Sequence, residues 1–153
     1  MAEEYDWRGD TAVDVSDLRR FIAAATGGEL RDDDTIFLPG MYVTSRQPAG
    51  DEVNPAMRLF GFDDRFSATF RFSSRVDQKT SAHAASLMVH AVIAFALQRE
   101  GRGVLLFNGE TAVLQYDGSD VVLDAEWEDW SENSEIAPLL TQFATQVLPQ
   151  PLL

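Results

Sequence analysis

The sequence predicts an α+β protein with a mostly antiparallel sheet, two main helices on one face and a short C-terminal helix. Strand-like segments follow one another through tight turns, and two stretches with helical spacing interrupt them. The chain has 153 residues, 45% of them hydrophobic, which is enough for one substantial core. We therefore expect a single domain over residues 1–153 with the element order β-α-β-β-β-β-α-β-β-β-α.

The N-terminal half is expected to hold one helix among five strands. Residues Glu3 to Trp7 alternate between apolar and acidic side chains, as in a strand. A helix follows, capped by Asp14 or Ser16 and ended by Gly27-Gly28. A polar loop is expected from Gln47 to Asn54. Further strands are expected at residues 36–38, 41–45, 57–62 and 66–72, with a turn at 63–65.

The C-terminal half is expected to pair a long helix with a three-stranded meander. Thr80 or Ser81 caps a helix that runs to about Glu100 and is apolar around much of its circumference, so it should pack against the sheet and be covered from a second side. Asn108-Gly109 between two apolar runs predicts a type I′ hairpin turn. Two more segments complete the order: a strand at 121–123 and a helix at about 135–147, capped by Ser131 or Ser134.

The charge and composition exclude several classes of protein. The formal net charge of −13 disfavours nucleic-acid and anionic-membrane partners and favours basic ones. There is no cysteine, so neither a disulfide nor a thiolate metal site is possible. The acidic N-terminus is unlike a signal peptide, and the longest apolar stretch, Ala84 to Leu97, is shorter than a membrane span. We expect a cytoplasmic protein.

No motif points to catalysis. The sequence contains no phosphate-binding glycine loop, no HExxH metal motif and no GxSxG nucleophile elbow. The two histidines, His83 and His90, lie seven residues apart, which is roughly 10 Å along a helix and too far to share one metal ion. We expect no catalytic residues, no metal site and no cofactor, and therefore a protein that is not an enzyme.

Residues 124–135 stand out because they combine six acidic residues with two tryptophans and contain no basic residue. Tryptophans are enriched in binding hot spots, and surrounding carboxylates steer and select a basic partner. The alternative is that one or both indoles are part of the core. The predicted partner-binding residues are Trp127, Glu128, Asp129, Trp130 and Glu132, with Asp32, Asp33 and Asp34 as a second acidic patch.

Several short segments, in order along most of the chain, resemble the swarming-inhibition-toxin immunity (Sit immunity) family of bacterial polymorphic-toxin systems. The most specific is Leu106-Phe107-Asn108-Gly109-Glu110 followed by Ala112-Val113-Leu114. The others are Glu4-Tyr5-Asp6-Trp7, Gly61-Phe62 ahead of the 66–72 strand, the long apolar helix, and Val122-Leu123 before Trp127 and Trp130. Residues 47–54 match no pattern of the family. The resemblance implies a protein that binds and neutralises a cognate toxin, and it transfers no catalytic residue.

The sequence thus favours an immunity protein that binds a toxin with a basic surface stoichiometrically, through an acidic, tryptophan-containing surface. The alternative is a small-ligand-binding or regulatory module without catalytic activity, whose pocket lies between sheet and helices.

Overall fold

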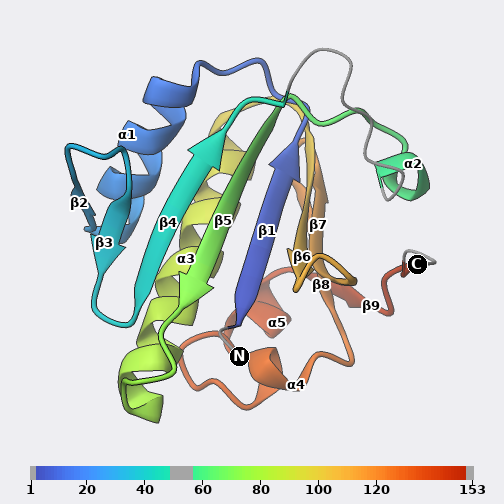
Figure 1. Cartoon of the computed structure of the whole chain (residues 1–153). Coiled ribbons are helices and arrows are strands. Elements are labelled where there is room, and N and C mark those ends of the chain that lie inside the picture. The colour runs from blue at the N-terminus through green and yellow to red at the C-terminus, as the bar shows by residue number, and fades with distance from the viewer. Residues whose placement is uncertain (1–2, 49–56, 151–153) are drawn as a thin grey trace.

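The computed structural model describes residues 3–48 and 57–150, and these form a mostly antiparallel sheet covered by helices (Figure 1). The sheet order in this part of the chain is β2-β3-β4-β5-β1-β6-β7-β8-β9, with only the β8–β9 pair parallel. The N-terminal strands are β1 (Glu4–Gly9), β2 (Glu29–Leu30), β3 (Ile36–Leu38), β4 (Met41–Arg46) and β5 (Phe66–Phe72). The C-terminal strands are β6 (Arg102–Phe107), β7 (Thr111–Asp117), β8 (Asp120–Asp124) and β9 (Ala144–Gln146).

The two main helices, α1 (Val15–Thr26) and α3 (Gln78–Gln98), lie side by side on one face of this sheet (Figure 1). Three short helices complete the chain: α2 (Met57–Phe60), α4 (Glu128–Ser131) and α5 (Leu139–Gln142). This arrangement confirms the predicted α+β class and the placement of both main helices.

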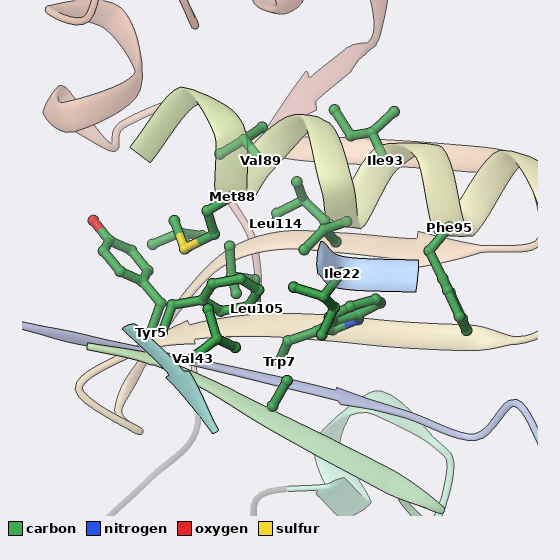
Figure 2. Packing of buried hydrophobic residues seen from close by; sticks show 14 of the residues in the cluster. Tyr5, Trp7, Ile22, Val43, Met88, Val89, Ile93, Phe95, Leu105 and Leu114 are labelled. Carbon is green, nitrogen blue, oxygen red and sulfur yellow. The ribbon is translucent and has the colours of Figure 1, made fainter. Parts of the chain in front are cut away.

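Strand β1 joins the two halves of the sheet because it pairs with β5 on one side and β6 on the other. Trp7 lies opposite Ala68 in β5 and opposite Leu105 in β6. The alternation seen in the sequence places Tyr5 and Trp7 on the helix-covered face, where both are buried. Figure 2 shows Trp7 meeting Ile22 from α1 and Phe95 from α3 in this layer.

The buried indole of Trp7 keeps its polar atom satisfied by a hydrogen bond to another strand. Its Nε1–H donates to the hydroxyl of Tyr116 at 3.1 Å. Burial raises the pKa of Tyr116, so this phenol stays neutral. The Tyr116 ring lies against the backbone of Gly103, where an added Cβ would stand 2.2 Å from the ring. Glycine at this position of β6 is therefore required by the packing of the core.

The hairpin between β6 and β7 forms at the predicted turn. Asn108 and Gly109 have φ angles of 51° and 72°, as a type I′ turn requires, and the amide of Glu110 donates to the carbonyl of Phe107 at 3.0 Å. The pairing shifts by one residue between Leu105 and Leu106, so that Val113 and Leu114 are both in the main core.

Helix α3 begins three or four residues earlier than predicted, because its N-cap is Asp77 and not Thr80 or Ser81. The Asp77 carboxylate accepts from the Thr80 amide at 2.7 Å, and the pKa of Asp77 is lowered chiefly by its hydrogen bond with the Thr80 side chain. By length and composition α3 could cross a membrane, but half of its most apolar window is buried inside the protein, as in a core helix. Its packing against the sheet and α1 follows the prediction.

The predicted strand at residues 57–62 was wrong. Residues 57–60 form the short helix α2, whose Met57 and Phe60 pack onto the sheet face opposite α1 and α3. Residues 49–54 of the predicted loop lie outside the described residues. The second apolar cluster on that face comprises Met57, Phe60, Phe62, Val104, Leu106, Ala112 and Leu148.

The predicted C-terminal helix at 135–147 was also wrong. The chain instead makes a turn at Asn133, whose carbonyl accepts from the amide of Ala137 at 2.8 Å, then the one-turn helix α5 and the edge strand β9. Pro138 lacks the amide that a continuous helix would need at that position. Ile136 and Leu139 are buried, whereas Val147, which would share their face in a continuous helix, is 62% exposed.

Candidate partner-binding surface

The acidic segment 124–135 follows β8 and passes below the N-terminal end of β1, and its helix α4 lies beside that end (Figure 1). Trp130 fixes it to the core, since its side chain is 0% exposed and its Nε1–H donates to the carbonyl of Val113 at 2.8 Å. The ring also stacks on Tyr5 with centroids 5.9 Å apart. Trp130 is therefore a core residue, and its predicted role as a partner contact was wrong.

Trp127 is only partly buried and lies at the border of the core. Its ring centroid is 4.9 Å from that of Phe107 and 6.5 Å from that of Trp130. Its indole N–H is shielded from solvent and meets no acceptor in the described part of the chain. Of the two tryptophans in the acidic segment, Trp127 is thus the one that is not fully buried.

The acidic side chains of this segment divide into structural and exposed ones. Asp124 is buried and accepts from the amide of Glu126 at 3.2 Å, which shapes the turn after β8. Glu128, Asp129 and Glu132 are exposed. The structure therefore leaves the three predicted carboxylates of this segment accessible to a partner.

Asn133 and Glu135 hold the segment to the N-terminal part of α3. The Asn133 side chain donates to the carbonyl of Ala82 at 2.9 Å and accepts from the amide of Glu135 at 3.0 Å. Glu135 also lies 2.8 Å from Nδ1 of His83. These contacts fix the position of the exposed carboxylates relative to the helix.

A cavity of about 250 Å³ opens between this segment, the start of β1, the end of β5 and the start of α3. The rings of Tyr5 and Phe72 form aromatic walls of this cavity, and Glu3, Asp129 and Glu132 contribute three carboxylates. No lysine or arginine is among the described residues that line it. We name this site, defined by these five residues, the acidic groove.

Tyr5 connects the acidic groove to the core. Figure 2 shows its ring at the edge of the main core with the hydroxyl pointing away from it, and this hydroxyl donates to Oδ2 of Asp129 at 3.4 Å. Burial raises the pKa of Tyr5, and the negative charge of Asp129 raises it further. The phenol therefore remains protonated and orients the carboxylate of Asp129.

Glu3 and Tyr5 were missing from the predicted site, although they line the groove. Tyr5 and Asp129 are 124 residues apart in the sequence, and their contact depends on the pairing of β1 in the middle of the sheet. The acidic run at Glu3 and Glu4 was visible in the sequence, but no local pattern could assign it to this end of the molecule.

The second predicted patch, Asp32 to Asp34, lies in the turn between β2 and β3, at the opposite corner of the sheet from α4 (Figure 1). All three residues are exposed. The hydrogen bond from the Thr35 side chain lowers the pKa of Asp33, and Asp34 lies 3.4 Å from Arg19 in α1. The structure therefore does not bring the two acidic patches together.

The two histidines lie on α3 and both are exposed. His83 contacts Glu135, as described above, and His90 lies further along the helix. Within residues 3–48 and 57–150, no three His, Asp or Glu side chains are placed to hold a metal ion.

Comparison with known proteins places the chain in a family. Residues 3–134 match the model of the family described as SitI3-like. No curated protein and no solved structure matches the chain. Because the family match spans most of the chain, and confirms the resemblance to Sit immunity proteins found in its sequence, this chain belongs to the SitI3-like family.

Proposed function

We propose that this protein is an immunity protein that neutralises a cognate toxin by stoichiometric binding through the acidic groove and the exposed edge of Trp127. The observation that carries this proposal is the geometry of the groove, in which three carboxylates surround a cavity with aromatic walls. Membership of the SitI3-like family supports a toxin as the partner. Inhibition then requires occupation of the toxin's surface and no catalytic step.

A basic side chain of the toxin fits the acidic groove in both shape and charge. The aliphatic part of an arginine or lysine would pack on the walls formed by Tyr5 and Phe72, while its charged end meets Asp129 and Glu132. The fixed positions of these carboxylates reduce the ordering cost of binding. Trp127 adds apolar contact area beside them.

The overall charge sets the class of partner and the rate of association. A net charge of −13 accelerates encounter with a basic toxin and disfavours nucleic acid and anionic membrane as partners. The proposed site of action is the cytoplasm, where a toxin that has entered the cell would be captured.

The proposal is tested by expressing the products of the neighbouring genes in a bacterial host. A product that arrests growth is taken as the candidate toxin. Co-expression of this protein should restore growth, and the purified pair should form a 1:1 complex in sedimentation velocity. Growth arrest that persists despite soluble co-expression, with no complex, would refute the function.

The double variant Asp129→Asn/Glu132→Gln tests the groove within this function. It removes two charges that face the cavity, so the dissociation constant should rise by about ten- to a hundredfold. The matched control is Asp120→Asn/Glu100→Gln, which removes two exposed charges at the opposite end of β8 and α3 from the groove. Equal weakening by both double variants would show that only the net charge matters.

A small organic cation is a second candidate occupant, because the cavity of about 250 Å³ is lined by three carboxylates and two aromatic rings. Ligands of this class should raise the melting temperature of the free protein, since they bind only the folded state. Arginine, agmatine and spermidine are suitable probes. A rise that disappears in Asp129→Asn/Glu132→Gln would place the cation in the acidic groove. Together with a failure of the parent protein to bind the toxin, it would favour the small-ligand-binding module.

A further inference from the structure

The half of the sheet that α2 does not cover exposes two aromatic rings on the face opposite α1 and α3. Phe37 in β3 and Tyr42 in β4 are direct neighbours across the strands and are 42% and 37% exposed. The row continues on one side to Glu29 in β2 and on the other to Arg71 in β5 and Glu4 in β1. We name these five residues the aromatic row.

Arginine side chains hold both rings in place. The guanidinium carbon of Arg31 lies 4.1 Å from the ring centroid of Phe37, which is a close cation–π contact. Arg71 lies over Tyr42, donates to its hydroxyl at 2.8 Å and forms an ion pair with Glu4. The rings are thus ordered before any partner arrives, which lowers the entropy lost on binding.

The exposure of these rings contrasts with the other half of the same sheet face. There, Val104 and Leu106 are buried because Met57, Phe60 and Leu148 cover them. No described segment covers Phe37 and Tyr42. Tyrosine, phenylalanine and arginine are the residue types enriched at protein interfaces, so this uncovered group has the composition of a docking surface.

The aromatic row approaches the acidic groove at the start of β1. Tyr42 near the start of β4, Arg71 near the end of β5 and Glu4 at the start of β1 lie side by side across these strands, and the start of β1 lies beside α4 (Figure 1). Glu3, which precedes Glu4, lines the groove, and its carbonyl accepts from the amide of Phe72 at 2.9 Å. The acidic groove and the aromatic row therefore adjoin at the start of β1, through the consecutive residues Glu3 and Glu4.

The charge around the exposed rings fits the same kind of partner as the groove does. Arg71 and Glu4 neutralise each other. Glu29, which pairs with Phe37, and Arg31, which lies over its ring, share one surface hollow with the exposed Asp32 and Asp33, so that carboxylates outnumber the single guanidinium there. A partner that places apolar side chains on the rings and basic ones around them would satisfy this surface.

We infer that the aromatic row is the apolar half of the toxin-docking surface, with Phe37 and Tyr42 as anchors for a basic protein whose cationic side chain occupies the adjacent acidic groove. This inference rests on the proposed function and names the part of the surface that supplies most of the affinity. The groove would then govern the association rate, and the rings would govern the dissociation rate.

The test measures the binding kinetics of single variants with the toxin identified by growth arrest and rescue. Phe37→Ala and Tyr42→Ala should each raise the dissociation rate at least about tenfold, with association nearly unchanged. Tyr42→Phe keeps the ring and should stay within about threefold of the parent. The matched control is Leu97→Ala, which removes a 52% exposed apolar side chain from α3, on the other side of the sheet. It should bind as the parent does.

A second measurement needs no variant and so does not depend on whether Phe37→Ala or Tyr42→Ala folds. Amide hydrogen exchange of the parent protein should slow at β3 and β4 when the toxin is bound. Parent-like dissociation rates for Phe37→Ala and Tyr42→Ala, together with weakened binding by Asp129→Asn/Glu132→Gln, would overturn this inference alone. If Phe37→Ala instead abolished a dimer of this protein without changing its affinity for the toxin, the row would be a self-association surface. A parent protein that binds no toxin would overturn both proposals.

Discussion

Residues 124–135 and residues 31–34 are both rich in carboxylates, yet they are attached to the fold in different ways. The first segment is fixed by the buried ring of Trp130 and by the side-chain contacts of Asn133 with α3. The second is held mainly by hydrogen bonds within its own turn, such as that from the amide of Arg31 to the carbonyl of Thr35 at 2.8 Å. Carboxylates at fixed positions can form a selective site, whereas carboxylates on a surface turn mainly add to the overall field.

The largest expected effect separates the two indoles of the acidic segment. Trp130→Ala should lower the free energy of unfolding by about 3–5 kcal/mol, because it leaves a large cavity and removes the hydrogen bond to Val113. Trp127→Ala should cost only about 1–2 kcal/mol, since its ring is partly exposed. Urea denaturation measures both values. Equal losses would contradict the assignment of only one indole to the core.

The next effect compares the two acidic segments in binding. Asp129→Asn/Glu132→Gln should lower the affinity for the toxin and flatten the salt dependence of the association rate between ~50 and ~500 mM. Asp32→Asn/Asp33→Asn removes the same charge from the turn and should change affinity by only about two- to threefold. Stopped-flow association measurements test this ranking. A larger effect at the turn would place the main contact there.

A smaller effect tests how the acidic segment is held. Asn133→Ala removes the hydrogen bond to the carbonyl of Ala82 and the acceptor for the amide of Glu135, and should destabilise the protein by about 1–2 kcal/mol. The toxin should also associate more weakly, because the carboxylates beside Asn133 lose their fixed positions. Ser134→Ala, at an exposed neighbouring position, is the control. If Asn133→Ala lowered the stability but left the affinity for the toxin unchanged, Asn133 would stabilise the fold without positioning the binding residues.

The smallest effect concerns the ionisation of the turn. In the folded protein the hydrogen bond from the Thr35 side chain lowers the pKa of Asp33 below its ordinary value of 3.8. The resulting stabilisation is present above pH 3.8 and disappears as the pH falls through the lowered pKa, because the folded state then takes up the proton too. Thr35→Val should move the pKa of Asp33 back towards 3.8 in a carboxyl NMR titration. An unchanged pKa would assign the shift to the backbone instead.

Most regular elements could be predicted because their signals are local. The alternation at 66–72, the Asn108-Gly109 turn and Gly27 after α1 each depend on the preferences of a few consecutive residues. The errors fall on segments where local signals conflict with packing. Residues 57–60 are apolar enough for a strand but form a helix that covers the sheet, and Pro138 interrupts the helical spacing of 136–147.

The site was only partly predictable for the same reason. The sequence revealed Glu128, Asp129 and Glu132, because an acidic run without counter-charges is a local feature. It did not reveal Glu3 and Tyr5, whose neighbours in the groove come from a distant part of the chain. It also did not reveal the exposed pair Phe37 and Tyr42, whose exposure depends on which segments cover that face of the sheet. The pairing of β3 with β4 places these two rings on one face, and only the packing of the other segments leaves that face uncovered.

By itself the sequence determined the fold class, the acidic character and the face that each strand presents, since these follow from composition and from spacing along the chain. Only the tertiary structure decided that Trp130 is enclosed while Trp127 stays accessible, and that Glu3 joins Asp129 at one cavity. The burial of a side chain depends on every element that packs around it. Here those elements are brought together by the insertion of β1 between β5 and β6.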